Sequence, residues 1–143
     1  MLKIGVAGAG YLGKIHIKIL KELSTLYELV GFYDADQQLS KDVESSFEVK
    51  SFNSVQSLID QVDCLAVVTA TLSHFDIAKC AVQARKHVFI EKPLTETVEE
   101  AKKLQRLVQE ADIIAQVGHV ERFNPVFLAA RKHLDRPMFI ETH

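Results

Sequence analysis

Residues 2–34 read LKIGVAGAGYLGKIHIKILKELSTLYELVGFYD, and this stretch decides the fold. Its apolar residues predict a first strand over Leu2–Ala7 and a second over Glu28–Tyr33. Between them, apolar residues at three- and four-residue spacing predict a helix from about Gly10 to Leu23, with one face packed on the sheet. The order strand, tight loop, helix, strand predicts one parallel βαβ unit. The residues expected on the apolar helix face are Leu12, Ile15, Ile19 and Leu23.

The loop between the first strand and the helix carries three glycines with the spacing G-x-G-x-x-G. Gly8 allows a tight turn, Gly10 lets a pyrophosphate approach the backbone, and Gly13 lets the helix pack close to the strand. The free N–H groups and the dipole of the first helical turn would then bind the phosphates. The loop predicts a dinucleotide site formed by Gly8, Ala9, Gly10, Tyr11, Leu12 and Gly13.

Asp34 lies 21 residues after Gly13, at the end of the second predicted strand. A carboxylate at this position accepts hydrogen bonds from the adenosine ribose of NAD and repels the 2′-phosphate of NADP. No Arg or Lys occurs between Asp34 and Ser40 to compensate that repulsion. The sequence therefore predicts NAD in preference to NADP.

The same glycines have two other interpretations. A tight turn without any ligand has a similar loop, but here the strand, the helix and the acidic residue all fall at the expected positions. Gly8 to Lys14 also spells G-x-x-x-x-G-K, the beginning of a nucleoside-triphosphate loop. That motif continues with a Ser or Thr that binds magnesium, and this chain has Ile15. The triphosphate interpretation is therefore rejected.

The composition is typical of a globular domain. The 143 residues, of which 48% are hydrophobic and 25% charged, predict one domain over residues 1–143. The formal net charge of −2 disfavours nucleic-acid binding, and no apolar run is long enough for a membrane span. The N-terminus lacks a signal-peptide pattern, and Cys64 and Cys80 lie in apolar segments, as buried free thiols do. We therefore expect a cytoplasmic protein with no membrane or nucleic-acid partner.

The rest of the chain alternates helical and strand patterns. After Asp36 a short polar helix is expected to about Ser45. Apolar runs predict strands over Val49–Phe52, Leu65–Thr69, Val88–Ile90, Ile113–Val117 and Met138–Glu141. Helix starts are predicted at the pairs Asn53 with Gln56, Ser73 with Asp76, Thr97 with Glu100, and Asn124 with Pro125. The helix after Thr97 is expected to bury Val98, Ala101, Leu104 and Val108.

This alternation predicts an α/β fold with a doubly wound parallel sheet, the Rossmann fold. Right-handed crossovers bring the loops that follow the strands to one edge of the sheet, where ligands bind. The four loops expected on this rim are Gly8–Gly13, Thr69–His74, Glu91–Pro93 and Gly118–Asn124.

Four motifs resemble one family. They are the glycine loop, the Thr69-x-Thr71-x-x-His74 loop, Glu91-Lys92-Pro93, and the run from Gly118 to Pro125 that reads GHVERFNP. In this order and spread over nearly the whole chain, they resemble the N-terminal nucleotide-binding domain of the glucose–fructose oxidoreductase, inositol dehydrogenase and MocA family. One departure is Ala70, where many members have proline.

The resemblance implies an oxidoreductase that transfers a hydride between a nicotinamide cofactor and a hydroxyl-bearing carbon of a sugar, cyclitol or related small molecule. Family members add a C-terminal α/β domain that supplies most substrate contacts, a catalytic His or Tyr and commonly the interface of a homo-oligomer. That domain is absent from this chain. We therefore expect the 143 residues to bind the cofactor and not to turn over substrate.

By the same resemblance, Lys92 is the candidate catalytic residue, where an ammonium would orient the substrate hydroxyl and stabilise negative charge on its oxygen. A cis Lys92–Pro93 bond is predicted in the turn after the strand. Arg122 either binds an anionic group or pairs with Glu121 or Glu91. Scattered histidines and the lack of a C-x-x-C pair disfavour a metal. The cofactor groove is expected to include Thr69, Ala70, Thr71, His74, Glu91, Lys92, Pro93 and Arg122.

Two other functions are possible for a nucleotide-binding fold of this kind. A nucleotide-binding sensor without catalysis shares the glycine loop but has no need of a lysine beside the nicotinamide. A short-chain dehydrogenase requires Tyr-x-x-x-Lys, and Tyr11, Tyr27 and Tyr33 are followed four residues later by Ile, Gly and Gln. The short-chain class is therefore excluded.

Overall fold

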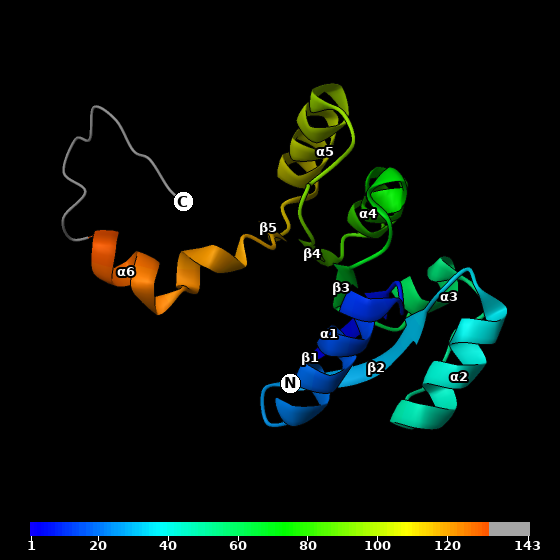
Figure 1. Ribbon diagram of the computed structural model, residues 1–143. Coiled ribbons are helices and arrows are strands. Elements are labelled where there is room, and N and C mark those ends of the chain that lie inside the picture. The colour runs from blue at the N-terminus through cyan, green and yellow to red at the C-terminus, as the bar shows by residue number, and fades with distance from the viewer. Residues whose placement is uncertain (132–143) are drawn as a thin grey trace.

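Five parallel strands form the sheet of the computed structural model, which describes residues 1–131 (Figure 1). Their order in the sheet is β2-β1-β3-β4-β5, so that the chain moves one way from β1 to β2 and the other way from β3 onward. This reversal lies between β1 and β3, as a doubly wound sheet requires. The strands are β1 (Leu2–Ala7), β2 (Tyr27–Tyr33), β3 (Cys64–Val67), β4 (His87–Ile90) and β5 (Ala115–Val117).

Helices cover both faces of the sheet, which confirms the predicted α/β architecture. The buried residues form two clusters, one shared with α1 and α2 and the other with α3, α4 and α5. Figure 1 shows α6 apart from the sheet, and Val126, Phe127 and Leu128 of that helix are exposed. The helices are α1 (Tyr11–Glu22), α2 (Gln37–Phe47), α3 (Val55–Ile59), α4 (His74–Gln83), α5 (Val98–Ala111) and α6 (Pro125–Arg131), with short 3-10 turns at Thr71–Ser73 and Val120–Phe123.

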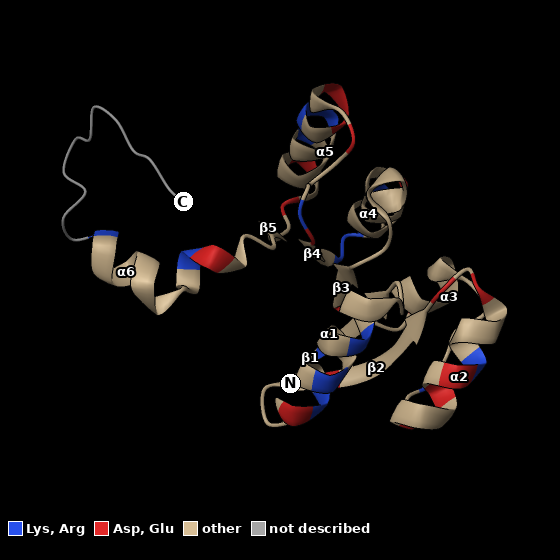
Figure 2. Cartoon of the chain, in the orientation of Figure 1, with Lys and Arg blue, Asp and Glu red and all other residues tan. Residues whose placement is uncertain are grey.

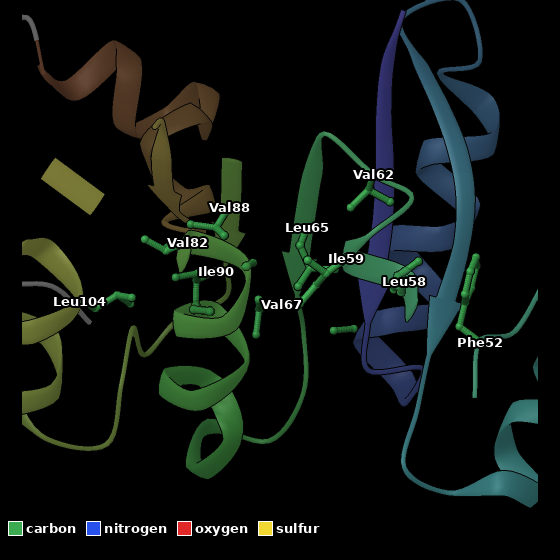
Figure 3. Packing of buried hydrophobic residues seen from close by; sticks show 13 residues of the cluster. Phe52, Leu58, Ile59, Val62, Leu65, Val67, Val82, Val88, Ile90 and Leu104 are labelled. Carbon is green, nitrogen blue, oxygen red and sulfur yellow. The ribbon is translucent and has the colours of Figure 1, made fainter. Parts of the chain in front are cut away.

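Strand β3 is buried on both faces. Leu65 and Val67 pack in the cluster beneath α4 (Figure 3). Cys64 and Ala66 pack in the cluster beneath α1. A central parallel strand is apolar throughout for this reason. The same burial raises the pKa of the Cys64 thiol to about 11, so the thiol is protonated at neutral pH. Cys80 is only partly buried.

Helix α1 packs on the sheet with a different face from the one predicted. Gly13, Ile17 and Leu20 are buried, whereas the four residues expected there are each more than one-third exposed. The cause is Gly13, whose α-carbon must approach the Gly8 carbonyl and so fixes the rotation of the helix. The four exposed residues, contrary to the prediction, are Leu12, Ile15, Ile19 and Leu23.

The predicted strand over Val49–Phe52 is reduced to one isolated bridge between Phe32 and Ser51. Val49 and Phe52 are buried, but the carboxylate of Glu44 accepts hydrogen bonds from both the N–H and the hydroxyl of Ser51. These bonds lower the pKa of Glu44. A side chain thus takes the backbone donor that a strand ladder would use.

Two of the four predicted helix caps are wrong. Helix α3 is capped by Ser54, whose hydroxyl accepts the Ser57 N–H, in place of Asn53. Ser73 makes no side-chain cap because a 3-10 turn leads directly into α4. The capping box of Thr97 with Glu100 is confirmed, and Asn124 accepts the Val126 N–H before α6.

On α5, Leu104 is buried, Ala101 and Val108 are partly buried, and Val98 is 64% exposed, contrary to its predicted burial. The expected strand Met138–Glu141 lies outside the described residues. Figure 2 shows that Lys, Arg, Asp and Glu are spread over α1, α2 and α5, while the sheet is largely uncharged. Among residues 1–131, no helix is both long and apolar enough to cross a membrane.

Candidate functional site

The glycine loop joins β1 to α1, and the surroundings of its three glycines differ. Gly8 has φ +98°, and a Cβ there would lie 2.7 Å from the backbone of Val68 and Thr69. A Cβ on Gly13 would lie 2.0 Å from the Gly8 carbonyl oxygen. Gly10, by contrast, has no atom within 4 Å of the position of a Cβ. The loop therefore combines two closely packed glycines with one that faces open space.

Asp34 anchors this loop from the end of β2. One carboxylate oxygen accepts the Ala9 N–H at 2.7 Å, and the other accepts the Asp36 N–H at 2.9 Å. The Gly8 N–H donates to the Tyr33 carbonyl at 2.8 Å. Each carboxylate oxygen has a second lone pair, so Asp34 can still accept hydrogen bonds from a ligand.

A cleft of about 510 Å³ opens between the glycine loop, the end of β2 and the loop after β3. It includes five residues predicted for the cofactor site, namely Gly8, Gly10, Asp34, Thr69 and Ala70. Sequence reasoning missed the other lining residues, Tyr33, Ala35, Val55, Val68, Leu72, Ser73, Asp76 and Ile77. Tyr33 and Ala35 could have been found as neighbours of Asp34 at the strand end, since ligands bind there. The α3 and α4 residues depend on tertiary packing.

The loop after β3 contains a buried hydroxyl, and a buried imidazole follows at the start of α4. The Oγ1 atom of Thr69 is buried and has no hydrogen-bond partner within residues 1–131. The ring of His74 is 1% exposed, and it contacts the Thr69 carbonyl through Nε2 at 3.0 Å and the Pro93 carbonyl through Nδ1 at 2.9 Å. His74 thus connects two loops of the rim beneath the cleft.

The loop after β4 contains Glu91, Lys92 and Pro93, and the predicted cis Lys92–Pro93 bond is confirmed. Glu91 is 6% exposed, and its carboxylate binds Nε2 of His16 at 3.0 Å and accepts the Lys92 N–H at 3.1 Å. Lys92 itself is exposed at the rim. No local sequence pattern predicts this role of His16, because its partner lies 75 residues away.

The remaining predicted residues lie outside the cleft. Arg122 is exposed in the turn Val120–Phe123, and neither acidic residue proposed as its partner pairs with it. Glu121 accepts a hydrogen bond from the Asn124 amide, and Glu91 binds His16. Thr71 starts the 3-10 turn before α4. Within the described part of the chain, no three His, Cys, Asp or Glu side chains gather as metal ligands.

The residues present fit a dinucleotide. The open backbone at Gly10 leaves space for phosphates, the orphaned hydroxyl of Thr69 lacks a partner beside that space, and Asp34 has free lone pairs. The cleft lies at the carboxyl ends of β1 and β3, where the strand order reverses. Fold and site together define a dinucleotide-binding domain of the Rossmann type.

Residues 2–119 match the family described as "Oxidoreductase family, NAD-binding Rossmann fold", which is the glucose–fructose oxidoreductase, inositol dehydrogenase and MocA family. The chain belongs to this family, as its motifs predicted. It is similar to UDP-N-acetylglucosamine 3-dehydrogenase of Acidithiobacillus ferrooxidans, with 33% identity over 92% of this chain and 41% of that protein. It is also similar to scyllo-inositol 2-dehydrogenase (NAD(+)) of Bacillus subtilis, with 33% identity over 94% of this chain and 40% of that protein.

Among solved structures, the chain is similar to biliverdin reductase of Synechocystis sp. PCC 6803 in complex with biliverdin and NADP+. The TM-score is 0.84 and the identity 30%, over 93% of this chain and 42% of that one. The chain thus spans about 40% of the length of the curated relatives described above.

Proposed function

We propose that this chain is the NAD-binding part of an oxidoreductase that transfers a hydride between the nicotinamide and a hydroxyl-bearing carbon of a sugar, cyclitol or related small molecule. The observation that carries the proposal is the open backbone at Gly10 beside the anchored carboxylate of Asp34. Two relatives named above are a sugar-nucleotide dehydrogenase and an inositol dehydrogenase, which supports the substrate class.

We further propose NAD in preference to NADP. The carboxylate of Asp34 lines the cleft at the end of β2, where it would face the adenosine ribose, and the neighbouring side chains of residues 35–40 include no cation. A 2′-phosphate there would face a negative charge, with no Arg or Lys among residues 35–40 to bind it. A related structure contains NADP+, so the preference needs its own measurement.

Lys92 is our candidate for the catalytic group of this chain. The bound nicotinamide supplies the hydride acceptor, and an ammonium at the rim would bind the substrate oxygen and stabilise the charge that develops on it. Glu91 supports this position because its buried carboxylate accepts the backbone N–H of Lys92. Substrate turnover would require groups beyond this chain, and so we expect binding without turnover from the 143 residues alone.

Calorimetric titration of the chain with NADH and with NADPH tests the proposal. We expect saturable NADH binding and at least about tenfold weaker NADPH binding. Gly10→Val should remove NADH binding while far-UV circular dichroism stays unchanged, because Gly10 has no neighbour in the free chain. Asp42→Asn is the control variant and should bind NADH as wild type does, since Asp42 is exposed on α2 outside the cleft. A folded chain that binds neither nucleotide would contradict the proposal.

A further inference from the structure

The two contacts of His74 impose a condition on its protonation. Both partners, the carbonyl oxygens of Thr69 and Pro93, can only accept hydrogen bonds. A neutral imidazole carries one N–H, and its other nitrogen has a lone pair. At 2.9 and 3.0 Å, a neutral ring would therefore bring one nitrogen lone pair against a carbonyl lone pair. Only a ring with both nitrogens protonated satisfies both contacts.

We propose that His74 is held as a buried imidazolium and is a positioning residue for the cofactor rim. Its ring joins the end of β3, which lines the cleft through Thr69, to Pro93, which directly follows Lys92. It thereby fixes Lys92 relative to the cleft. It also places a positive charge beneath a cleft whose ligand carries two phosphates. The positioning role rests on the proposed NAD-binding function, whereas the protonation state does not.

Burying a cation without a partner is costly, so the environment of the ring has to compensate. Within residues 1–131 no carboxylate is hydrogen-bonded to the ring, and the compensation comes from two charge-assisted bonds to carbonyl dipoles. The nearby Glu91 carboxylate is already bound to His16 and to the Lys92 N–H. The charged groups on the elements around the ring are Asp76 and Lys79 on α4, Glu91 and Lys92 after β4, and Glu99, Glu100, Lys102, Lys103, Arg106 and Glu110 on α5.

His87 provides an internal reference with the opposite requirement. Its Nδ1 accepts the backbone N–H of Ile114 at 3.1 Å, so this nitrogen must carry a lone pair. The same chain thus contains one histidine whose partners are both acceptors and one whose partner is a donor. Any measurement of ring protonation can compare the two directly.

Long-range ¹H–¹⁵N correlation spectra of the labelled 143-residue chain at about pH 7 test the protonation state without any ligand. We expect both ring nitrogens of His74 to show the chemical shifts of protonated nitrogens. His87 should show one protonated nitrogen and one bare nitrogen. A bare nitrogen on His74 in the folded chain would overturn the assignment. Wild-type protein suffices, so the outcome does not depend on the folding of a variant.

The positioning role is tested by the pH dependence of NADH affinity. At a pH high enough to deprotonate the His74 ring, one of its two contacts opens, and the wild-type affinity for NADH should decrease. His74→Gln should bind NADH about tenfold more weakly than wild type at about pH 7. The decrease in NADH affinity that follows deprotonation of His74 should be absent in this variant. His87→Gln is the matched control and should retain the NADH affinity of wild type and its dependence on pH. A folded His74→Gln chain with an unchanged pH profile would show a merely structural role.

The two experiments separate the two proposals. If the spectra show an imidazolium and the chain does not bind NADH, the proposed function and the positioning role fail while the assignment of charge stands. If NADH binds and His74 has a bare nitrogen, the proposed function stands and the imidazolium is wrong.

Discussion

The two ends of the cofactor rim are built in different ways. At the glycine loop the geometry is fixed by backbone and by the absence of side chains, with Gly13 packed against the carbonyl of Gly8. At the loop after β4 it is fixed by two buried polar side chains. His74 contacts the carbonyls of Thr69 and Pro93, and Glu91 accepts the N–H of Lys92 and binds His16. The first end should not tolerate added atoms, and the second should not tolerate lost polar atoms.

The largest expected effect is that of Gly13→Ala. A Cβ there would lie 2.0 Å from a backbone carbonyl oxygen, which cannot move aside as a flexible side chain would. We expect the free energy of unfolding to decrease by about 3 kcal/mol. This loss outweighs the gain of about 1 kcal/mol that alanine brings to a helix. Urea denaturation monitored by circular dichroism measures it.

Gly10→Ala is the matched control for this prediction. Gly10 has φ −62° and ψ −162°, which alanine also adopts, and its Cβ would meet nothing within 4 Å. Its free energy of unfolding should stay within about 0.5 kcal/mol of wild type. Equal stability losses in the two variants would show that the loop is not fixed by close packing at Gly13.

Glu91→Ala probes the opposite end. It removes the acceptor for the Lys92 N–H and the partner of His16, and it leaves space beneath Gly118. We expect the free energy of unfolding to decrease by about 2 kcal/mol. Thermal and urea unfolding measure the loss. Glu91→Gln keeps one acceptor oxygen and should lose less than half as much; if it loses as much as alanine, charge and not hydrogen bonding dominates at this end.

The same contrast explains what the sequence could predict. The tight turn at Gly8 and the close packing at Gly13 could be predicted from local spacing, because one turn and one helix start determine them. The pair His16–Glu91 was missed because it joins residues that only the folded sheet brings together. The buried face of α1 was predicted wrongly because the spacing of apolar residues does not reveal the close contact of Gly13 with Gly8. The contact of Gly13 with Gly8, directly after β1, sets the rotation of that helix and places Ile17 and Leu20 on the sheet.

Asp34→Asn should have a smaller effect on stability. An amide replaces one of the two oxygens that accept the N–H groups of Ala9 and Asp36, which should lower the free energy of unfolding by about 1 kcal/mol. Removal of the charge should also shift the ratio of NADPH to NADH affinity toward NADPH by about tenfold. Parallel titrations with the two nucleotides measure this shift. An unchanged ratio would mean that Asp34 does not face the 2′ position.

The smallest effect on stability is expected for Thr69→Val, at the junction of the two ends. Valine has nearly the shape of threonine, and the Thr69 hydroxyl is buried without a partner in the described chain. Removing an unsatisfied polar group should leave the free energy of unfolding unchanged or raise it by up to about 1 kcal/mol. NADH binding should nevertheless weaken by about tenfold, because the hydroxyl would gain its partner only from the cofactor. Denaturation and titration of the same sample measure both quantities. If the variant binds NADH as wild type does, the orphaned hydroxyl does not contact the cofactor, and binding depends on the glycine end alone.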